Sequence, residues 1–129
     1  MFKKIFLLLS IFVTLSFSNV DYVYDIETAK TKAQSENKQI LVMFSMENCP
    51  ACEYMKDVVF DNKDVAGYLN TYFVVYEVDY NKKETFPQGL TPFGTPTFYV
   101  LKSDGERIGR ALVGGMTANV FLEKLRTYR

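Results

Sequence analysis

Histidine and tryptophan are both absent from this chain of 129 residues. Without histidine there is no imidazole general base, no cysteine–histidine nucleophile pair and no copy of the commonest metal ligand. Two cysteines without histidine also cannot form the usual tetrahedral zinc site. The 15 basic and 15 acidic residues cancel, so the composition has no electrostatic footprint for nucleic acid, and we predict no nucleic-acid partner.

A long apolar run is also missing. The apolar stretch at residues 5–17 is too short for a membrane-spanning helix, which needs about 20 residues. Lys3 and Lys4 precede it, and Ser16 and Ser18 supply small residues at the two positions that a signal peptidase reads. We predict a signal peptide over residues 1–18, cleaved after Ser18, and one domain over residues 19–129. The alternative is an uncleaved anchor; either way the domain is exported to the periplasm, where disulfides can persist.

Cysteine is scarce, and its placement is informative. Cys49 and Cys52 are the only two cysteines, and the 48% hydrophobic content gives a core that needs no disulfide to hold it together. They form C-P-A-C directly after an apolar run, residues 40–45, that is typical of a buried strand. The following segment, residues 51–58, has a helical pattern, and Pro50 suits its first turn. A C-x-x-C motif at a strand-to-helix junction indicates thiol redox chemistry.

This position predicts separate roles for the two sulfurs. Cys49 lies near a helix N-terminus, where the helix dipole favours the thiolate, and is the expected nucleophile. Cys52, one helical turn later, is the expected resolving thiol that attacks the mixed disulfide. Pro50 and Ala51 between them carry no charge and have a supporting role only. This chemistry requires neither a cofactor nor a metal.

The remaining pattern predicts an α/β domain with a small mixed sheet. Strands separated by helices indicate parallel pairing, and a late hairpin indicates an antiparallel edge. The helix at residues 51–58 should turn Tyr54, Met55, Val58 and Val59 to the core. The expected helices are residues 26–37, 51–58, 62–69 and 117–125, and the expected strands are residues 40–45, 72–79, 97–101 and 107–113.

Three motifs resemble the thioredoxin-like superfamily. They are C-P-A-C after the first strand, G-T-P-T at residues 94–97 before the third strand, and Gly114-Gly115 before the last helix. The segment at residues 44–62 is similar to a periplasmic branch that includes the C-terminal domain of a transmembrane electron transporter and small exported thioredoxins. The resemblance implies the thioredoxin-like fold, with a central mixed sheet of four to five strands and helices on both faces.

The resemblance also implies a second site element at Thr95 and Pro96. In the family this proline is cis and faces the cysteines, and the backbone of the preceding residue, here Thr95, pairs with an extended substrate segment. A simple tight turn is the alternative reading of G-T-P-T. Two departures from thioredoxin stand out: Asn48 replaces a tryptophan, and Met43 replaces a buried aspartate that serves the second cysteine.

Several nearby residues have two readings. Glu47 and Glu53 are the nearest carboxylates in the sequence, either catalytic groups or solvated charges. Met43, Met46 and Met55 suggest Cu(I) ligands or core methionines. The aromatic residues Tyr80, Phe86 and Phe93 suggest either a docking surface or core packing.

Together these observations predict an exported thiol:disulfide oxidoreductase. We expect a monomeric reductase that takes electrons from a membrane electron-donor protein and passes them through Cys49 and Cys52 to disulfide-containing periplasmic proteins. Three alternatives remain: a disulfide-donating oxidase, a Cu(I)-binding carrier that uses Cys49, Cys52 and Met46, and a binding module whose disulfide is only structural.

Overall fold

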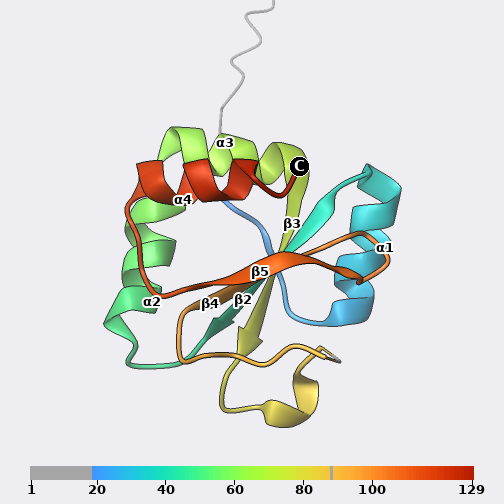
Figure 1. Cartoon of the computed structure of the whole chain (residues 1–129), viewed down its shortest axis with the longest axis horizontal. Helices are drawn as coiled ribbons and strands as arrows, with labels where there is room; N and C mark the ends of the chain where they lie inside the picture. The colour runs from blue at the N-terminus through green and yellow to red at the C-terminus, as the bar shows by residue number, and fades with distance from the viewer. Residues whose placement is uncertain (1–18, 88) are drawn as a thin grey trace, which may run out of the picture.

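The computed structural model describes residues 19–87 and 89–129, and a five-stranded sheet lies at its centre (Figure 1). The predicted signal peptide, residues 1–18, lies outside the described residues. None of the helices in the described ranges is both long enough and apolar enough to cross a membrane. In chain order the elements are β1 (Tyr22–Val23), α1 (Ile26–Glu36), β2 (Gln39–Ser45), α2 (Pro50–Tyr54), η1 (Met55–Val59), α3 (Lys63–Tyr72), β3 (Phe73–Asp79), η2 (Lys83–Thr85), β4 (Thr97–Leu101), β5 (Arg107–Val113) and α4 (Ala118–Arg126).

The strand order is β1-β3-β2-β4-β5. Strands β1 and β2 both run parallel to β3, whereas β4 runs antiparallel to β2 and β5 antiparallel to β4. In this register Met43 of β2 stands between Glu77 of β3 and Phe98 of β4. The fold is the predicted α/β class with a mixed sheet, and helices cover both of its faces.

The two faces of the sheet hold separate cores. Alternate residues of β2 and β3 point to opposite sides, so Leu41 and Met43 join one cluster while Ile40 and Val42 join the other. The first cluster, which includes both cysteines, lies under α2, η1, α3 and α4; α1 covers the second (Figure 1). The cysteine pair is therefore built on the more heavily covered face.

Local signals explain where most helices begin and end. The Asp25 carboxylate accepts a hydrogen bond from the Thr28 backbone N–H at 2.8 Å, and the Asn62 side chain accepts from the N–H groups of Asp64 and Val65. Such side-chain caps satisfy amide donors that have no partner inside the helix. Helix α1 ends where Asn37 adopts a left-handed conformation with φ of 53°.

The segment after the cysteines departs from the predicted single α-helix. Helix α2 ends at Tyr54 and continues as a turn of π-helix, closed by a hydrogen bond from the Phe60 N–H to the Met55 carbonyl at 2.8 Å. A π-turn inserts one residue and so rotates the residues that follow it. Met55 and Val59 are fully buried as predicted, but Tyr54 and Val58 are 41% and 53% exposed, so their predicted place in the core was wrong.

Strand β1 was not predicted at all. It contains only Tyr22 and Val23, which pair with Val75 and Tyr76 of β3. Two residues are too few to show the alternating pattern on which strand prediction depends. With β1 included, the sheet has five strands, which agrees with the predicted four to five.

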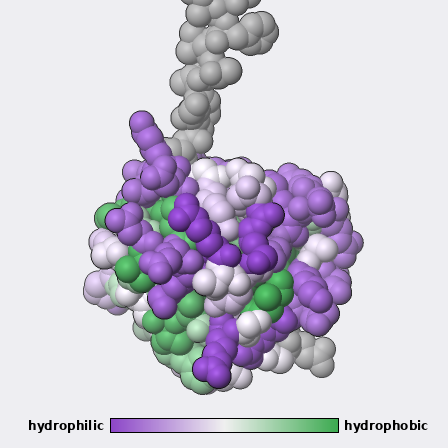
Figure 2. Space-filling model, turned by 45° about the horizontal axis from the view of Figure 1, so that its top comes forward, coloured by the Kyte–Doolittle hydropathy of each residue, from purple (hydrophilic) through white to green (hydrophobic). Residues whose placement is uncertain are grey.

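The surface over α3 and α4 is predominantly hydrophilic. Figure 2 shows charged and polar residues across this face, with apolar residues confined to separate patches between them. Large exposed apolar patches are typical of protein–protein interfaces. This face has the mixed character of an ordinary water-exposed surface.

Candidate active site

The Cys49–Cys52 pair lies just beyond the carboxyl end of β2, at the start of α2. Cys49 is the N-cap residue of α2 and Pro50 occupies its first turn, which is the position where proline loses no hydrogen bond. The two cysteines form a disulfide with their Cα atoms 5.2 Å apart. Cys49 is 7% exposed and Cys52 only 1%, so Cys49 is the more accessible of two buried cysteines.

The sulfur of Cys49 lies among hydrogen-bonding groups from two segments of the chain. The Cys52 backbone N–H points to it at 3.2 Å, and the Thr95 hydroxyl donates to it at 3.4 Å. The Thr95 carbonyl oxygen lies 3.6 Å from the same sulfur. The fold thus brings together Cys49 and Thr95, which the sequence separates by 46 residues. A thiolate formed at Cys49 would find two donors already in place.

The loop that carries Thr95 is fixed at both ends. The Thr97 hydroxyl donates to the Gly94 carbonyl at 2.7 Å and accepts from the Phe93 N–H at 3.0 Å. The peptide bond between Thr95 and Pro96 is cis, and Pro96 is buried. The Pro96 carbonyl accepts a hydrogen bond from the Gly114 N–H at 2.8 Å. These bonds hold Thr95 against Cys49.

A second loop, residues 114–116, packs against the helix of the cysteines. A Cβ atom on Gly115 would stand 3.4 Å from the Cβ of Ala51, so the two residues are in close contact. The Met116 N–H points to the sulfur of Met55 at 3.4 Å. Ala51 therefore has a packing role at the site, and Pro50 begins its helix.

Sequence reasoning missed an ion pair beside Cys52. Lys56 Nζ lies 2.6 Å from Glu77 Oε2, and their side chains are only 32% and 18% exposed. Both residues line a cavity of about 320 Å³ that Cys52 also lines. A signal was available, because alternation along β3 puts Glu77 on the same face as Phe73 and Val75, which is the face of the cysteines.

The structure distinguishes between the two interpretations of the methionines and aromatic residues near the cysteines. Met43 and Met55 are fully buried core residues, whereas Met46 is 40% exposed at the rim of the Cys52 cavity. Phe86 packs edge-on against Phe44, with ring centres 5.0 Å apart, and Phe93 is 63% exposed. Over the described ranges, no three acidic or cysteine side chains lie close enough together to hold one metal ion.

Glu47 and Glu53 are both exposed and both line the Cys52 cavity. With Glu77 and Asp79 they place four carboxylates there against the single ammonium of Lys56. The site is thus a disulfide at a helix N-terminus, next to an acidic cavity.

Comparisons with known proteins agree with this geometry. A family model described as a thioredoxin-like domain matches residues 26–129. The solution structure of a thioredoxin from Thermus thermophilus superimposes with a TM-score of 0.69 at 30% identity, over 84% of this chain and 86% of that one.

Proteins named for disulfide interchange are also similar. The chain is 25% identical over 118 residues to the thiol:disulfide interchange protein DsbD of Vibrio cholerae, covering 86% of this chain but only 19% of that protein. The C-terminal domain of DsbD from Neisseria meningitidis, in the oxidised form, has a TM-score of 0.63 at 23% identity, over 80% of this chain and 91% of that one. The oxidoreductase DsbH has a TM-score of 0.60 at 16% identity, over 85% and 84%. At these identities the two structures support the fold alone.

Proposed function

Because this chain belongs to the thioredoxin-like family and has the fold and the C-x-x-C disulfide of a thiol:disulfide oxidoreductase, we propose that it works as a reductase. In this role the reduced pair passes two electrons to a disulfide of another protein. Cys49 attacks the substrate disulfide, and Cys52 then attacks Cys49 to release the reduced substrate. The observation that carries the proposal is the position of Cys49, the more accessible cysteine, at the helix start, with Cys52 almost fully buried behind it.

The charges around the cysteine pair favour a role as a reductase over a role as an oxidase. A strongly oxidising pair needs a reduced form that is stabilised as a thiolate. Here the cavity beside Cys52 contains four carboxylates and one ammonium, and nearby negative charge disfavours a thiolate. Pro50 and Ala51 add no positive charge. The disulfide should therefore be the favoured form, and the dithiol a good electron donor.

Substrate would bind beside Thr95 and Pro96. The Thr95 carbonyl lies 3.6 Å from the Cys49 sulfur, close enough for an extended segment paired with this backbone to present its disulfide to Cys49. Recognition through backbone hydrogen bonds accepts many sequences, which suits a general reductase. We infer disulfide-containing proteins as the substrates.

The cellular setting is part of the same proposal. The features of residues 1–18 support an export signal that is cleaved after Ser18, leaving the domain at residues 19–129 in the periplasm. Electrons would then come from a membrane protein, in keeping with the 25% identity to an interchange protein named DsbD. We also propose that the chain works as a monomer.

Cysteine variants test the reaction. Cys49→Ser should abolish the reduction of insulin disulfides by the chain, because it removes the attacking sulfur. Cys52→Ser should instead accumulate a mixed disulfide between Cys49 and the substrate, visible as an added mass in intact-protein mass spectrometry. A Cys49→Ser variant that still reduced insulin would show that the assignment of the nucleophile is wrong.

A further inference from the structure

Cys52 must lose a proton before it can attack, and its surroundings make this difficult. Its side chain is 1% exposed, and burial in an apolar environment disfavours the charged thiolate. The neighbouring β2 residue on the same face, Met43, has no group that accepts a proton. The proton of Cys52 therefore has to leave through the cavity that Cys52 lines.

The Lys56–Glu77 pair occupies that cavity from two directions. Lys56 comes from the π-helical segment η1, one turn after Cys52, and Glu77 comes from β3. Their charged atoms are 2.6 Å apart, and Glu77 Oε2 is buried with no hydrogen-bond partner besides this ion pair. A half-buried carboxylate with an ammonium on one side keeps lone pairs available for another donor.

We propose that Glu77, held in place by Lys56, is the proton acceptor for Cys52. The inference rests on the proposed dithiol function and assigns it a residue that the C-x-x-C motif does not contain. The cavity of about 320 Å³ has room for water, since one water fills about 30 Å³. Because both residues line this cavity, we infer that water in it links the Cys52 thiol to the Glu77 carboxylate.

The step balances within the exchange reaction. The Cys52 thiol gives its proton to the Glu77 carboxylate, and the resulting thiolate attacks the sulfur of Cys49 in the mixed disulfide. The bond between Cys49 and the substrate breaks, the Cys49–Cys52 disulfide forms, and the substrate sulfur leaves as a thiolate. That thiolate takes a proton from the solvent, and Glu77 returns its own proton to the solvent. The enzyme dithiol is oxidised, and the substrate disulfide is reduced.

Other acidic groups near Cys52 fit this role less well. Glu47 and Glu53 also line the cavity, but both are exposed, so bulk water solvates their carboxylates. The Asp79 carboxylate already accepts a hydrogen bond from the Asn81 N–H at 2.9 Å. Asp57, on η1, is also exposed. Glu77 is the carboxylate that combines burial with a position on the cavity wall.

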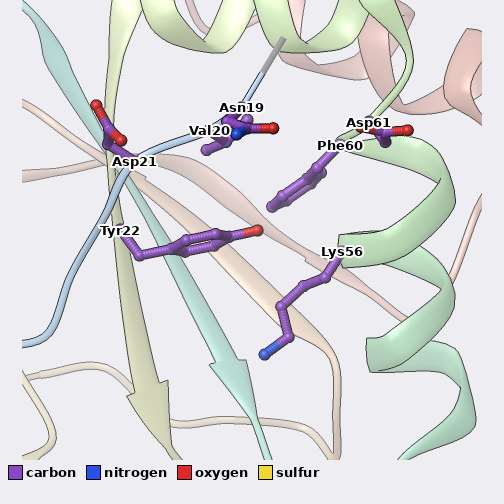
Figure 3. Close-up of a pocket in the computed structure, with 7 residues that line it drawn as sticks. All are labelled: Asn19, Val20, Asp21, Tyr22, Lys56, Phe60 and Asp61. Carbon is purple, nitrogen blue, oxygen red and sulfur yellow. The ribbon is translucent and has the colours of Figure 1, made fainter. Parts of the chain in front are cut away.

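Tyr22 lies near the ion pair, in a second pocket that Lys56 also lines. Figure 3 shows Tyr22 and Phe60 extending toward one another from β1 and from the helical segment, with the Lys56 side chain beside them and its ammonium pointing away from the phenol. Burial raises the pKa of the Tyr22 phenol well above its usual range, and the negative charge of Glu77 raises it further. The phenol thus stays protonated and does not compete with Glu77 as a base. Tyr22 and Lys56 line the same pocket, and Lys56 also lines the Cys52 cavity.

Single-turnover kinetics separate the two cysteines. One equivalent of dithiobis-nitrobenzoate added to the fully reduced wild-type chain should release thionitrobenzoate in two phases, the first from attack by Cys49 and the second from resolution by Cys52. In Glu77→Gln the second phase should slow by about a hundredfold at neutral pH, the usual loss for an acid–base group. Its pH profile should also move to higher pH, because hydroxide must then remove the proton. The first phase should change less than about twofold.

Matched variants make the result specific. Asp57→Asn neutralises an exposed carboxylate on η1 that does not line the cavity and should leave both phases unchanged, whereas Glu77→Asp keeps a carboxylate and should restore part of the second phase. If Glu77→Gln does not fold, Lys56→Met tests the same pair, because it removes the cation that holds the Glu77 carboxylate in place. The second phase should then slow while the first phase is unchanged.

Two different failures can be told apart. A wild-type chain that releases only one equivalent would contradict the dithiol function itself. A wild-type chain that releases both equivalents, with Glu77→Gln matching its second phase at every pH, would overturn the role of Glu77. A fall in melting temperature with an unchanged pH profile would likewise identify the pair as structural and contradict the proposal.

Discussion

The hydroxyl of Thr95 lies 3.4 Å from the Cys49 sulfur, and the Cys52 N–H lies 3.2 Å away. In the reduced protein both donors would stabilise a Cys49 thiolate. We expect Thr95→Val, which keeps the shape but loses the hydroxyl, to lower the thiolate fraction at neutral pH. Alkylation of Cys49 by iodoacetamide should slow by up to about tenfold, the equivalent of about 1.4 kcal/mol for a charge-assisted hydrogen bond.

Thr95→Ser is the matched control, since it retains the hydroxyl and should keep most of the alkylation rate. Measuring the rate across a range of pH shows whether the thiolate population has changed. Equal profiles for Thr95→Val and the wild type would show that the backbone N–H of Cys52 is the sufficient donor.

Single residues differ in how well the sequence reveals them. Cys49, Cys52 and Pro96 stand in short motifs, so their proximity to a helix start or a strand start could be predicted. No short motif marks the Thr95 hydroxyl or Glu77 as part of the site, although alternation along β3 assigns Glu77 to the face of the cysteines. Their contacts depend on how β3 and the loop before β4 align with β2, and that register joins residues more than 30 positions apart.

At the scale of elements, Asn62 fixes the start of α3 by accepting hydrogen bonds from two backbone N–H groups, at 3.0 and 3.2 Å. Replacing it with alanine leaves these donors without a side-chain partner. We expect Asn62→Ala to lower the free energy of unfolding by about 1 kcal/mol, measured by urea denaturation of the oxidised chain. Asn62→Asp should retain most of the stability because it can still accept both bonds; a loss equal to that of alanine would contradict the capping role.

The start of α1 should make stability depend on pH. Hydrogen bonds from the side chain and backbone of Thr28 lower the pKa of Asp25 below its ordinary value of 3.8. The folded state therefore prefers the charged carboxylate, whose contribution is present above the pKa of the unfolded chain and is lost as the pH falls through the lower folded value.

We accordingly expect the wild type to lose more melting temperature than Asp25→Asn between about pH 5 and about pH 2. Asparagine can still cap the helix but does not titrate, so it isolates the contribution of the charge. Thermal unfolding followed by circular dichroism at several pH values measures the difference. Parallel curves for the two proteins would show that the Thr28 hydrogen bonds do not depend on the charge of residue 25.

Helices with caps were predictable because the cap residue is a local signal, as Asp25 and Asn62 illustrate. The π-turn at Met55–Val59 was not, because no residue in it breaks the α-helical pattern. Its cause is tertiary: the extra residue brings Met55, Val59 and Phe60 together into the core beneath α4. Lys56 takes its position beside Glu77 in the same turn, so the unpredicted element and the unpredicted ion pair are linked.

At the scale of the whole molecule, the order of strands and helices was predictable, and it placed β2 and the cysteines at the centre of the fold. The family resemblance supplied what the pattern alone did not, namely that the loop before β4 meets the cysteines. The charge environment of the pair comes from the assembled structure, because four carboxylates reach one cavity from a loop, a helix and a strand.

The acidic environment of the cysteine pair should affect both the reduction potential and the stability of the folded chain. In a thermodynamic cycle, the reduction potential falls as the folded oxidised form becomes more stable relative to the folded reduced form. Because the acidic cavity disfavours a thiolate near Cys52, we expect the oxidised chain to unfold at a higher urea concentration than the reduced chain. A reduced form that proved the more stable would contradict the proposed reductase.

The reduction potential itself is the decisive measurement of this whole-molecule property. Equilibrating the domain at residues 19–129 with defined thiol buffers, and trapping free thiols, should give a value near the −270 mV of thioredoxin. A value near the −120 mV of a strong periplasmic oxidant would instead make the chain a disulfide donor. The two outcomes differ by about 150 mV, or about 7 kcal/mol. By the thermodynamic cycle, the gap in unfolding free energy between the oxidised and reduced chains should differ by this amount between the two outcomes, so the two experiments check each other.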